Sequence, residues 1–214
     1  MMSAQLPWRG AAEYKKWVLQ MRRFCFFIAL CRDRGSGTVT IDGDGNPRMH
    51  YPLDPHDRRS MEDGLEVAMR SAAAEGCDVI GTGQARFGDG QMVELPLGPQ
   101  GGESQEEFCR LEAARAAAVD AAVREMRKVG VTADFRCSLF SAHQMGTCRM
   151  GSSSANSVVK ANGETWAVEN LYVADASVFP TPSGANPMIT TMAINTGTGR
   201  LLAAKLAAQR GSKL

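Results

Sequence analysis

Ser141-Ala-His-Gln-Met-Gly-Thr-Cys-Arg-Met-Gly151 is the stretch of this 214-residue chain that says most about its fold. It holds two glycines, several small residues and one histidine, without a regular hydrophobic period. Such a composition is typical of backbone that approaches a ligand closely. Histidine is the side chain best suited to take up a proton at neutral pH. The stretch therefore indicates a functional loop in which His143 is the candidate proton acceptor.

The segment downstream of this loop predicts a strand, a turn and a helix. Leu171-Tyr-Val-Ala-Asp175 is typical of a buried strand that ends in a carboxylate, and small residues and a proline-rich turn follow it. Asn186-Pro187 predicts a helix start, with Asn as the N-cap and Pro at the first helical position, and the helix should run to about Gln209. A helix N-terminus offers free amides and partial positive charge to whatever lies before it.

Upstream of the loop, periodicity and capping patterns predict alternating helices and short strands. Two helices open with a hydroxyl residue three positions before an acid, which is the pattern of a capping box. The expected elements are a helix over Ala11 to Ile28 ending near Arg32, a hairpin of 38–41 and 48–53, a helix from Ser60 to Gly76, strands near 79–80 and 92–95, and a helix from Ser104 to Gly130.

Composition excludes several classes of protein. The chain is 44% apolar and 22% charged, and 24 basic against 23 acidic residues leave a net charge of +1, so neither nucleic acid nor an anionic membrane is an expected partner. The longest strongly apolar run, Phe24 to Cys31, falls short of the about 20 residues that span a bilayer. No secretory signal precedes Gly10, so export is not expected. The six cysteines form no C-x-x-C pair and are expected to be reduced thiols.

Two weak motifs do not support a ligand site. Asp42 to Asn46 resembles the start of a calcium loop, but Pro47 stands where that loop needs glycine and Leu53 where it needs glutamate. Val79 to Gly83 resembles a strand entering a dinucleotide-binding turn, but Arg86 stands where the third glycine belongs. We therefore expect no metal site, and we find no nucleotide-binding fingerprint in this sequence.

The C-terminal motifs taken together resemble the signature of the glucose-methanol-choline (GMC) flavin oxidoreductases. They are His143 to Gly151, Val173 to Pro180, and Asn186-Pro187, and their wording is most similar to that of the long-chain fatty alcohol oxidases. The resemblance implies an α+β fold with an antiparallel sheet and packed helices. It implies a substrate-domain portion over 1–140 and a segment over 141–214 that lines flavin and active site. The family's N-terminal Rossmann part is absent from this sequence, so an N-terminal FAD domain would be needed.

The same resemblance implies a chemistry and roles for six residues. Long-chain alcohols would be oxidised to aldehydes, with FAD as cofactor and O2 reduced to hydrogen peroxide. His143 would accept the alcohol proton, and Asn186 would hydrogen-bond the same oxygen. Asp175 and Ala176 would meet the ribityl and phosphate region of FAD. Pro187 and Met188 would bring the first amides of the closing helix to the flavin pyrimidine.

Several alternatives remain open from the sequence. The chain could belong to another GMC enzyme, namely a dehydrogenase with a different electron acceptor, a hydroxynitrile lyase or a light-driven fatty acid decarboxylase, or it could be a truncated fragment without catalysis. The apolar face of Phe24 to Leu30 predicts a buried helix stripe, with peripheral membrane contact as the other interpretation. Ser212-Lys213-Leu214 predicts recognition by the peroxisomal import receptor and hence a peroxisomal location.

Overall fold

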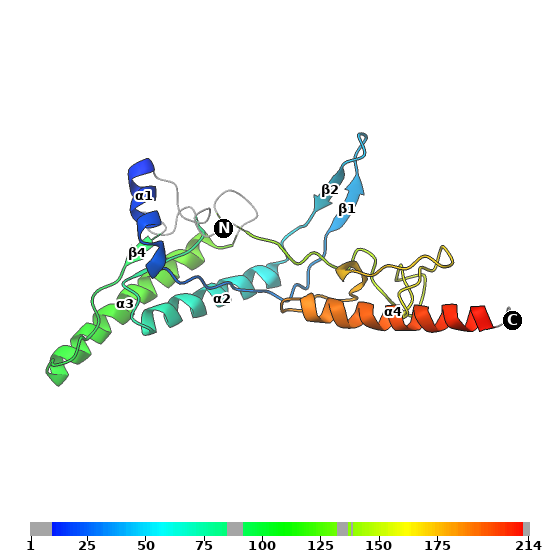
Figure 1. Ribbon diagram of the computed structural model, residues 1–214. Coiled ribbons are helices and arrows are strands. Elements are labelled where there is room, and N and C mark those ends of the chain that lie inside the picture. The colour runs from blue at the N-terminus through cyan, green and yellow to red at the C-terminus, as the bar shows by residue number, and fades with distance from the viewer. Residues whose placement is uncertain (1–9, 85–91, 132–136, 138, 212–214) are drawn as a thin grey trace. The chain divides into compact units, whose positions relative to one another are not determined.

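Helices and short antiparallel strands alternate along the chain, as the expected α+β class requires. The computed structural model describes residues 10–84, 92–131, 137 and 139–211 (Figure 1). Its elements are α1 (Ala11–Leu19), the 3-10 helix η2 (Met21–Arg23), β1 (Thr38–Ile41), β2 (Pro47–His50), α2 (Pro55–Ala74), β3 (Val79–Gly81), β4 (Met92–Glu94), α3 (Gln105–Val129), the 3-10 helix η3 (Ala176–Val178) and α4 (Met188–Gly211). β1 pairs with β2 and β3 with β4, each pair antiparallel. The α+β prediction is confirmed.

The chain forms two compact units. The first unit comprises the residues up to 37 together with 51–140, and the second comprises 38–50 together with 141–214. The β1–β2 hairpin, which the sequence predicts over 38–53, belongs to the second unit. Across the described residues, no helix combines the length and apolarity needed to cross a membrane.

In the first unit, α2 lies against α3 and β3 against α2 (Figure 1). The core between them includes Met69 of α2, Ile80 of β3, and Val123 and Met126 of α3. The buried guanidinium of Arg115 satisfies carbonyls at the end of α2 and beyond, donating to the oxygens of Ala73, Cys77 and Pro96. Carbonyls at a helix end have no helical partners, so the Arg115 guanidinium supplies the missing hydrogen-bond donors at this end of the core.

The predicted start of α2 at Ser60 is wrong. α2 begins at Pro55, and the Asp54 carboxylate accepts the amide of His56 at 2.7 Å, which makes Asp54 the N-cap. The Ser60 hydroxyl instead donates to the His56 carbonyl, one turn back in the same helix. Asp followed by Pro is itself a strong start signal, and it is stronger than the capping pattern that follows it.

The predicted long N-terminal helix is wrong beyond its first half. α1 ends at Leu19 and η2 at Arg23, after which Phe24 takes an extended conformation. Phe24 and Phe26 are half-buried whereas Cys25 and Phe27 are exposed, which is the alternation of an extended chain. The Phe24 ring packs 6.0 Å from that of the buried Trp17. The contact between Phe24 and Trp17 therefore accompanies an extended segment where the sequence predicts a helix.

In the second unit, the loop of residues 141–151 runs beside η3. The amide of Cys148 donates to the carbonyl of Ser177 at 2.9 Å, and that of Met150 to the carbonyl of Val178 at 2.8 Å. Val178 and Phe179 are buried together with Val159 in a small core that Ile194 of α4 also contacts. The loop and η3 therefore form one hydrogen-bonded and packed layer.

The strand predicted over Leu171 to Asp175 is wrong. Only an isolated bridge joins Tyr172 to Glu164, and Leu171 is 50% exposed. The Val173 amide donates to the carbonyl of Gly163. The segment therefore pairs at single points with a neighbouring loop, and no described strand continues the ladder on either side.

Gly163 allows α4 to pack closely against this loop. Its φ is +82°, a conformation that other residues rarely adopt, and a Cβ atom there would lie 2.7 Å from the Thr198 side chain of α4. The buried Thr198 thus lies directly against backbone. Any larger residue at 163 would push the helix away from the loop.

A buried carboxylate ties the same loop to α4. Glu164 accepts Lys205 Nζ of α4 at 3.0 Å, Lys160 Nζ at 3.2 Å and the amide of Asn170 at 3.0 Å. The Lys205 ammonium also donates to the oxygens of Asn170 and Tyr172. The Asn170 amide and the two ammonium groups lower the pKa of Glu164 from 4.5 to about 2. This cluster holds the C-terminal half of α4 in place.

Glu164→Gln is expected to lower the melting temperature of the chain at pH 7 by about 5 °C or more, because hydrogen bonds to a charged partner are lost inside a small unit. The folded-state pKa lies below the ordinary one, so the stabilisation is complete above about pH 4.5 and is lost as the pH falls toward 2. The difference in melting temperature between wild type and variant should therefore shrink across this window, as circular dichroism can measure.

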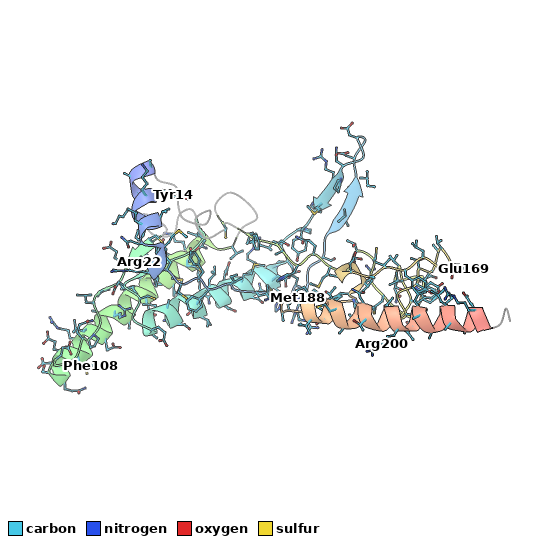
Figure 2. The ribbon with its side chains drawn as sticks, viewed as in Figure 1. Tyr14, Arg22, Phe108, Glu169, Met188 and Arg200 are labelled. Atoms are coloured by element: carbon cyan, nitrogen blue, oxygen red, sulfur yellow. The ribbon has the colours of Figure 1, made fainter. Side chains whose placement is uncertain are left out.

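The exposed Glu169, in the same loop, provides the matched control (Figure 2). Glu169→Gln should leave the melting temperature unchanged at every pH. An equal effect of the two substitutions would contradict the role given to Glu164.

Candidate active site

His143 lies in the loop that leads into the contact with η3. Its side chain is half-buried, and within the described part of the chain its ring makes no hydrogen bond. Three residues later, the Gly146 amide donates to the Ala176 carbonyl at 3.4 Å. The backbone after His143 is thus held to the fold, while the imidazole is left available for a substrate.

Gly146 is required at this point of the loop. Its φ is +87°, and a Cβ atom would lie 3.3 Å from the carbonyl oxygen of Phe179. A side chain here would be strained in conformation and crowded against buried backbone. The glycine therefore sets how closely the loop of His143 approaches the turn that follows η3.

Asp175 and Ala176 open the turn on the other side of this contact. The Asp175 carboxylate accepts the Ser177 amide at 2.7 Å and caps η3. Asp175 is exposed and Ala176 is half-buried. One carboxylate oxygen thus orders the turn, and the exposed side chain can meet a ligand as well.

Asn186, Pro187 and Met188 form the entry to α4. The Pro187 carbonyl accepts both the Thr191 amide and the Thr191 hydroxyl at 2.8 Å, so it takes the first helical hydrogen bond. The predicted N-cap role of Asn186 is wrong, because its exposed side chain accepts no amide among the described residues. Proline restricts the residue before it to extended conformations, and Pro187 itself supplies the capping carbonyl.

The N-terminal end of α4 carries no negative charge of its own. The first turn of α4 carries no acidic residue, and Met188 and Ile189 are 67% and 70% exposed. The first amides of a helix lack intrahelical acceptors and carry partial positive charge. This end of α4 is therefore suited to an electron-rich ligand. The same unit holds His143 and Asn186, whose side chains make no hydrogen bond to the described residues.

Sequence reasoning missed the groups that hold the site together. Motif spacing singles out His143 and Asn186, whereas the loop is positioned by backbone bonds from Cys148 and Met150 and by packing on Phe179. Glu164 was also missed. The available signal was its spacing of four residues from Lys160, but Lys205 lies 41 positions away and gives no local signal.

One group outside this unit has the composition of a metal site. Ligand atoms of Cys31, Asp33 and Asp57 lie within 4.8 Å of one another. The Asp57 carboxylate, however, already accepts the amides of Arg34 and Gly35 at 2.8 to 3.0 Å. Burial, and then the two aspartates, raise the pKa of the Cys31 thiol. We assign this group to the support of the 31–35 backbone and place no metal there.

Comparison with known proteins points to one family. Residues 33–195 match the family model described as GMC oxidoreductase. The chain is 34% identical to long-chain-alcohol oxidase FAO4A of Arabidopsis thaliana over 194 residues, which are 91% of this chain and 23% of that protein. It is also 34% identical to long-chain-alcohol oxidase FAO3 of the same plant over 190 residues, 89% of this chain and 23% of that protein.

Among solved structures, the crystal structure of pyridoxine 4-oxidase from Mesorbium loti is similar with a TM-score of 0.45 and 21% identity, covering 79% of this chain and 28% of that one. The chain spans about a quarter of the length of the curated relatives it matches. The family model matches well over half of the chain, around the His143 loop and the entry to α4. The chain therefore belongs to the GMC oxidoreductase family.

Proposed function

We propose that this chain forms the C-terminal part of an FAD-dependent oxidase that converts long-chain alcohols to aldehydes and reduces O2 to hydrogen peroxide. The similarity to two long-chain-alcohol oxidases over about nine tenths of the chain supports the substrate class. The observation that carries the chemistry is the uncommitted pair His143 and Asn186, whose side chains make no hydrogen bond within the described chain.

The residues at the entry to α4 fit the flavin end of FAD. The free amides after Pro187 and the absence of an acidic first turn suit the pyrimidine edge, while Asp175 and Ala176 would face the ribityl and phosphate region. FAD, when bound, supplies the group that accepts the hydride of the alcohol. A Gly-x-Gly-x-x-Gly turn for the adenosine and pyrophosphate would come from an N-terminal FAD domain outside this sequence.

The two polar side chains have complementary roles in this proposal. The His143 imidazole removes the proton from the alcohol hydroxyl, for which a half-buried ring without a hydrogen bond to the described residues is suited. The Asn186 side-chain amide donates a hydrogen bond to the same oxygen as negative charge develops on it. Together they orient the alcohol and stabilise the alkoxide as it forms.

Oxygen uptake with a long-chain alcohol tests the proposal. We expect the chain, co-expressed with the flavin-binding part of a long-chain-alcohol oxidase, to consume O2 and form an equal amount of peroxide with cetyl alcohol. The chain alone should be nearly colourless after purification, because the three-glycine turn is missing.

Other outcomes would assign a different activity. Reduction of an artificial acceptor without oxygen uptake would indicate a dehydrogenase, cyanohydrin cleavage a lyase, and hydrocarbon release from a fatty acid in light a decarboxylase. Stoichiometric flavin on the chain alone would contradict the need for a further domain.

We further propose delivery to the peroxisome through Ser212, Lys213 and Leu214, which lie outside the described residues. This tripeptide is the C-terminal signal read by the peroxisomal import receptor. A fluorescent protein fused before residue 1 should give punctate fluorescence that overlaps a peroxisomal marker, and removal of the three residues should make it diffuse. Cytosolic fluorescence of the intact fusion would contradict the proposal.

A further inference from the structure

The segment that includes the end of α1 and the chain after it exposes apolar side chains that the sequence predicts to be buried. Phe24 to Leu30 should form a buried helix stripe, but no helix forms there, and Phe27, Ile28 and Leu30 are 53%, 81% and 47% exposed. Leu19, the last residue of α1, is 81% exposed. Large apolar side chains left open close together mark a surface that binds something.

The opposite side of this segment is packed, which fixes the side that is open. The Phe24 ring lies 6.0 Å from that of the buried Trp17 and 6.2 Å from that of Phe26. Further along, Ala29 lies against α2, because a Cβ atom on Gly64 would come 2.7 Å from the Ala29 Cβ. Figure 1 shows the chain after η2 running along α2. Since side chains alternate along an extended chain, the two neighbours of Ala29 face away from α2.

Four basic side chains lie in the same segment. Lys15, Lys16, Arg22 and Arg23 are all exposed, and no acidic residue occurs from position 14 to position 32. Helical spacing places both lysines on the side of α1 that carries Leu19. The whole chain has 24 basic and 23 acidic residues, so its near-zero net charge conceals this local excess. The expectation that the chain meets no anionic membrane, which rests on net charge, therefore does not apply to this segment.

The basic groups of the segment are not neutralised by the fold. Lys15, Arg22 and Arg23 form no ion pair with any residue that the structure describes. By contrast, Arg70 and Arg127 pair with carboxylates of α2 and α3. A partner that complements the segment must therefore offer negative charge and apolar contact side by side.

The backbone of the segment limits how deeply it can enter an apolar phase. The amides of residues 25–30 donate to no described residue. Amides without acceptors are costly in hydrocarbon, whereas the headgroup layer of a bilayer still holds water and lipid oxygens. A strand of another protein would also accept these amides, but it would not by itself account for four basic groups without acidic partners. The surface of an anionic bilayer satisfies both.

We propose that this segment docks the chain on an anionic lipid bilayer, through the exposed residues here called the 15–30 surface: Lys15, Lys16, Leu19, Arg22, Arg23, Phe27, Ile28 and Leu30. The apolar side chains enter the boundary between headgroups and acyl chains, and the basic ones stay among the anionic headgroups. The surface is inferred without reference to the reaction. Its use, to collect an alcohol dissolved in the bilayer, rests on the proposed function.

Sedimentation with lipid vesicles tests the proposal in the absence of flavin, alcohol and turnover. We expect the 214-residue chain to bind vesicles of phosphatidylcholine that contain about a third of phosphatidylserine, and to stay in solution with vesicles of phosphatidylcholine alone. NaCl at about 0.5 M should release most of the bound chain, because salt screens its attraction to the headgroups.

Reversal of charge on the 15–30 surface should abolish most of this binding. Arg22→Glu combined with Arg23→Glu is expected to reduce binding to the anionic vesicles at least ten-fold. Arg58→Glu combined with Arg59→Glu is the matched control, because these are adjacent exposed arginines of α2 in the same unit. Both double variants change the net charge equally, so binding close to wild type in the control assigns the loss to the 15–30 surface.

Two milder variants test the surface without adding negative charge. Ile28→Ser should weaken binding several-fold, whereas Val67→Ser, at an apolar residue of α2 that is 64% exposed, should not. Lys15→Gln combined with Lys16→Gln should also weaken it several-fold. Circular dichroism should show all variants folded like wild type, and these milder ones keep the test decisive if charge reversal disturbs the fold.

The proposal would be overturned by a wild-type chain that ignores anionic vesicles, by equal binding to neutral vesicles, or by full binding of the Arg22 and Arg23 double variant. A dimer of the chain alone, measured by light scattering, that this variant dissociates would show an interface between copies instead. Loss of assembly with the flavin-binding part of a long-chain-alcohol oxidase in the same variant would equally contradict the proposal. An enzyme that binds vesicles but oxidises no alcohol would refute the proposed function alone, and an active oxidase that ignores vesicles would refute this inference alone.

Discussion

His143→Ala is expected to lower kcat and kcat/KM together by about 10²-fold or more in the flavin-loaded enzyme. General-base catalysis contributes roughly 10²- to 10⁴-fold, and its loss falls on the transition state, so both constants should fall by the same factor. The measurement is the anaerobic rate of flavin reduction by cetyl alcohol in rapid mixing. Flavin content should remain that of wild type, because the His143 ring makes no hydrogen bond within the described fold.

His50→Ala provides the control for this experiment. His50 is an exposed histidine of β2, and no role in the chemistry is assigned to it. Its substitution should leave both constants unchanged. A His143→Ala enzyme that is reduced at the wild-type rate would show that another group takes the proton. A higher KM with unchanged kcat would show that His143 only binds the alcohol.

The elements that could be predicted are those whose sequence signals lie within a few residues. The β1–β2 hairpin follows from a β-branched run and an Asp-Gly turn, and the two strands do pair, with Val39 opposite Met49. The start of α3 follows from the capping pattern, and the Ser104 hydroxyl does accept the Glu107 amide. In both cases the stabilising contacts lie within a few residues, where sequence spacing fixes the geometry.

Two of the failed predictions, the strand over 171–175 and the helix beyond Leu19, depended on packing partners outside the local pattern. Leu171 to Asp175 has the composition of a strand, but a strand needs a partner of equal length, and the loop at Gly163 and Glu164 offers only single bonds. Whether Phe24 continues a helix depends on Trp17 being there to pack against. Residue spacing carries no information on either condition.

For the site, the sequence identified side chains but not their environment. The motif spacing selects His143 and Asn186, and the structure places both in one unit. The sequence does not predict that the carbonyl of Pro187, and not the side chain of Asn186, accepts the first amide of α4. This correction matters because a capping asparagine would have a structural reason to be there. Without that reason, the exposed amide of Asn186, which makes no hydrogen bond to the described residues, is open to a ligand.

Asn186→Asp is expected to slow the anaerobic reduction step by about 10²-fold while the melting temperature stays unchanged. Removal of one donor to a developing oxyanion costs about 10²- to 10³-fold, and the substitution also places negative charge beside the alkoxide. Stability should hold because the Asn186 side chain is exposed and accepts no amide among the described residues. Rapid mixing and circular dichroism of the same preparation give both values.

Asn186→His tests the same role by replacing the amide donor with an imidazole donor. An imidazole N–H can donate to the same oxygen as the Asn186 amide, so the variant should keep measurable activity. If Asn186 were only structural, the Asp variant would turn over normally and the His variant would be the less stable of the two. Normal reduction by alcohol in both Asn186→Asp and His143→Ala would mean that the alcohol oxygen is bound and deprotonated elsewhere. The opposite result, slow chemistry in a fully stable Asp variant, would support a direct role of Asn186 at the reacting oxygen, because its side chain makes no hydrogen bond to the described residues.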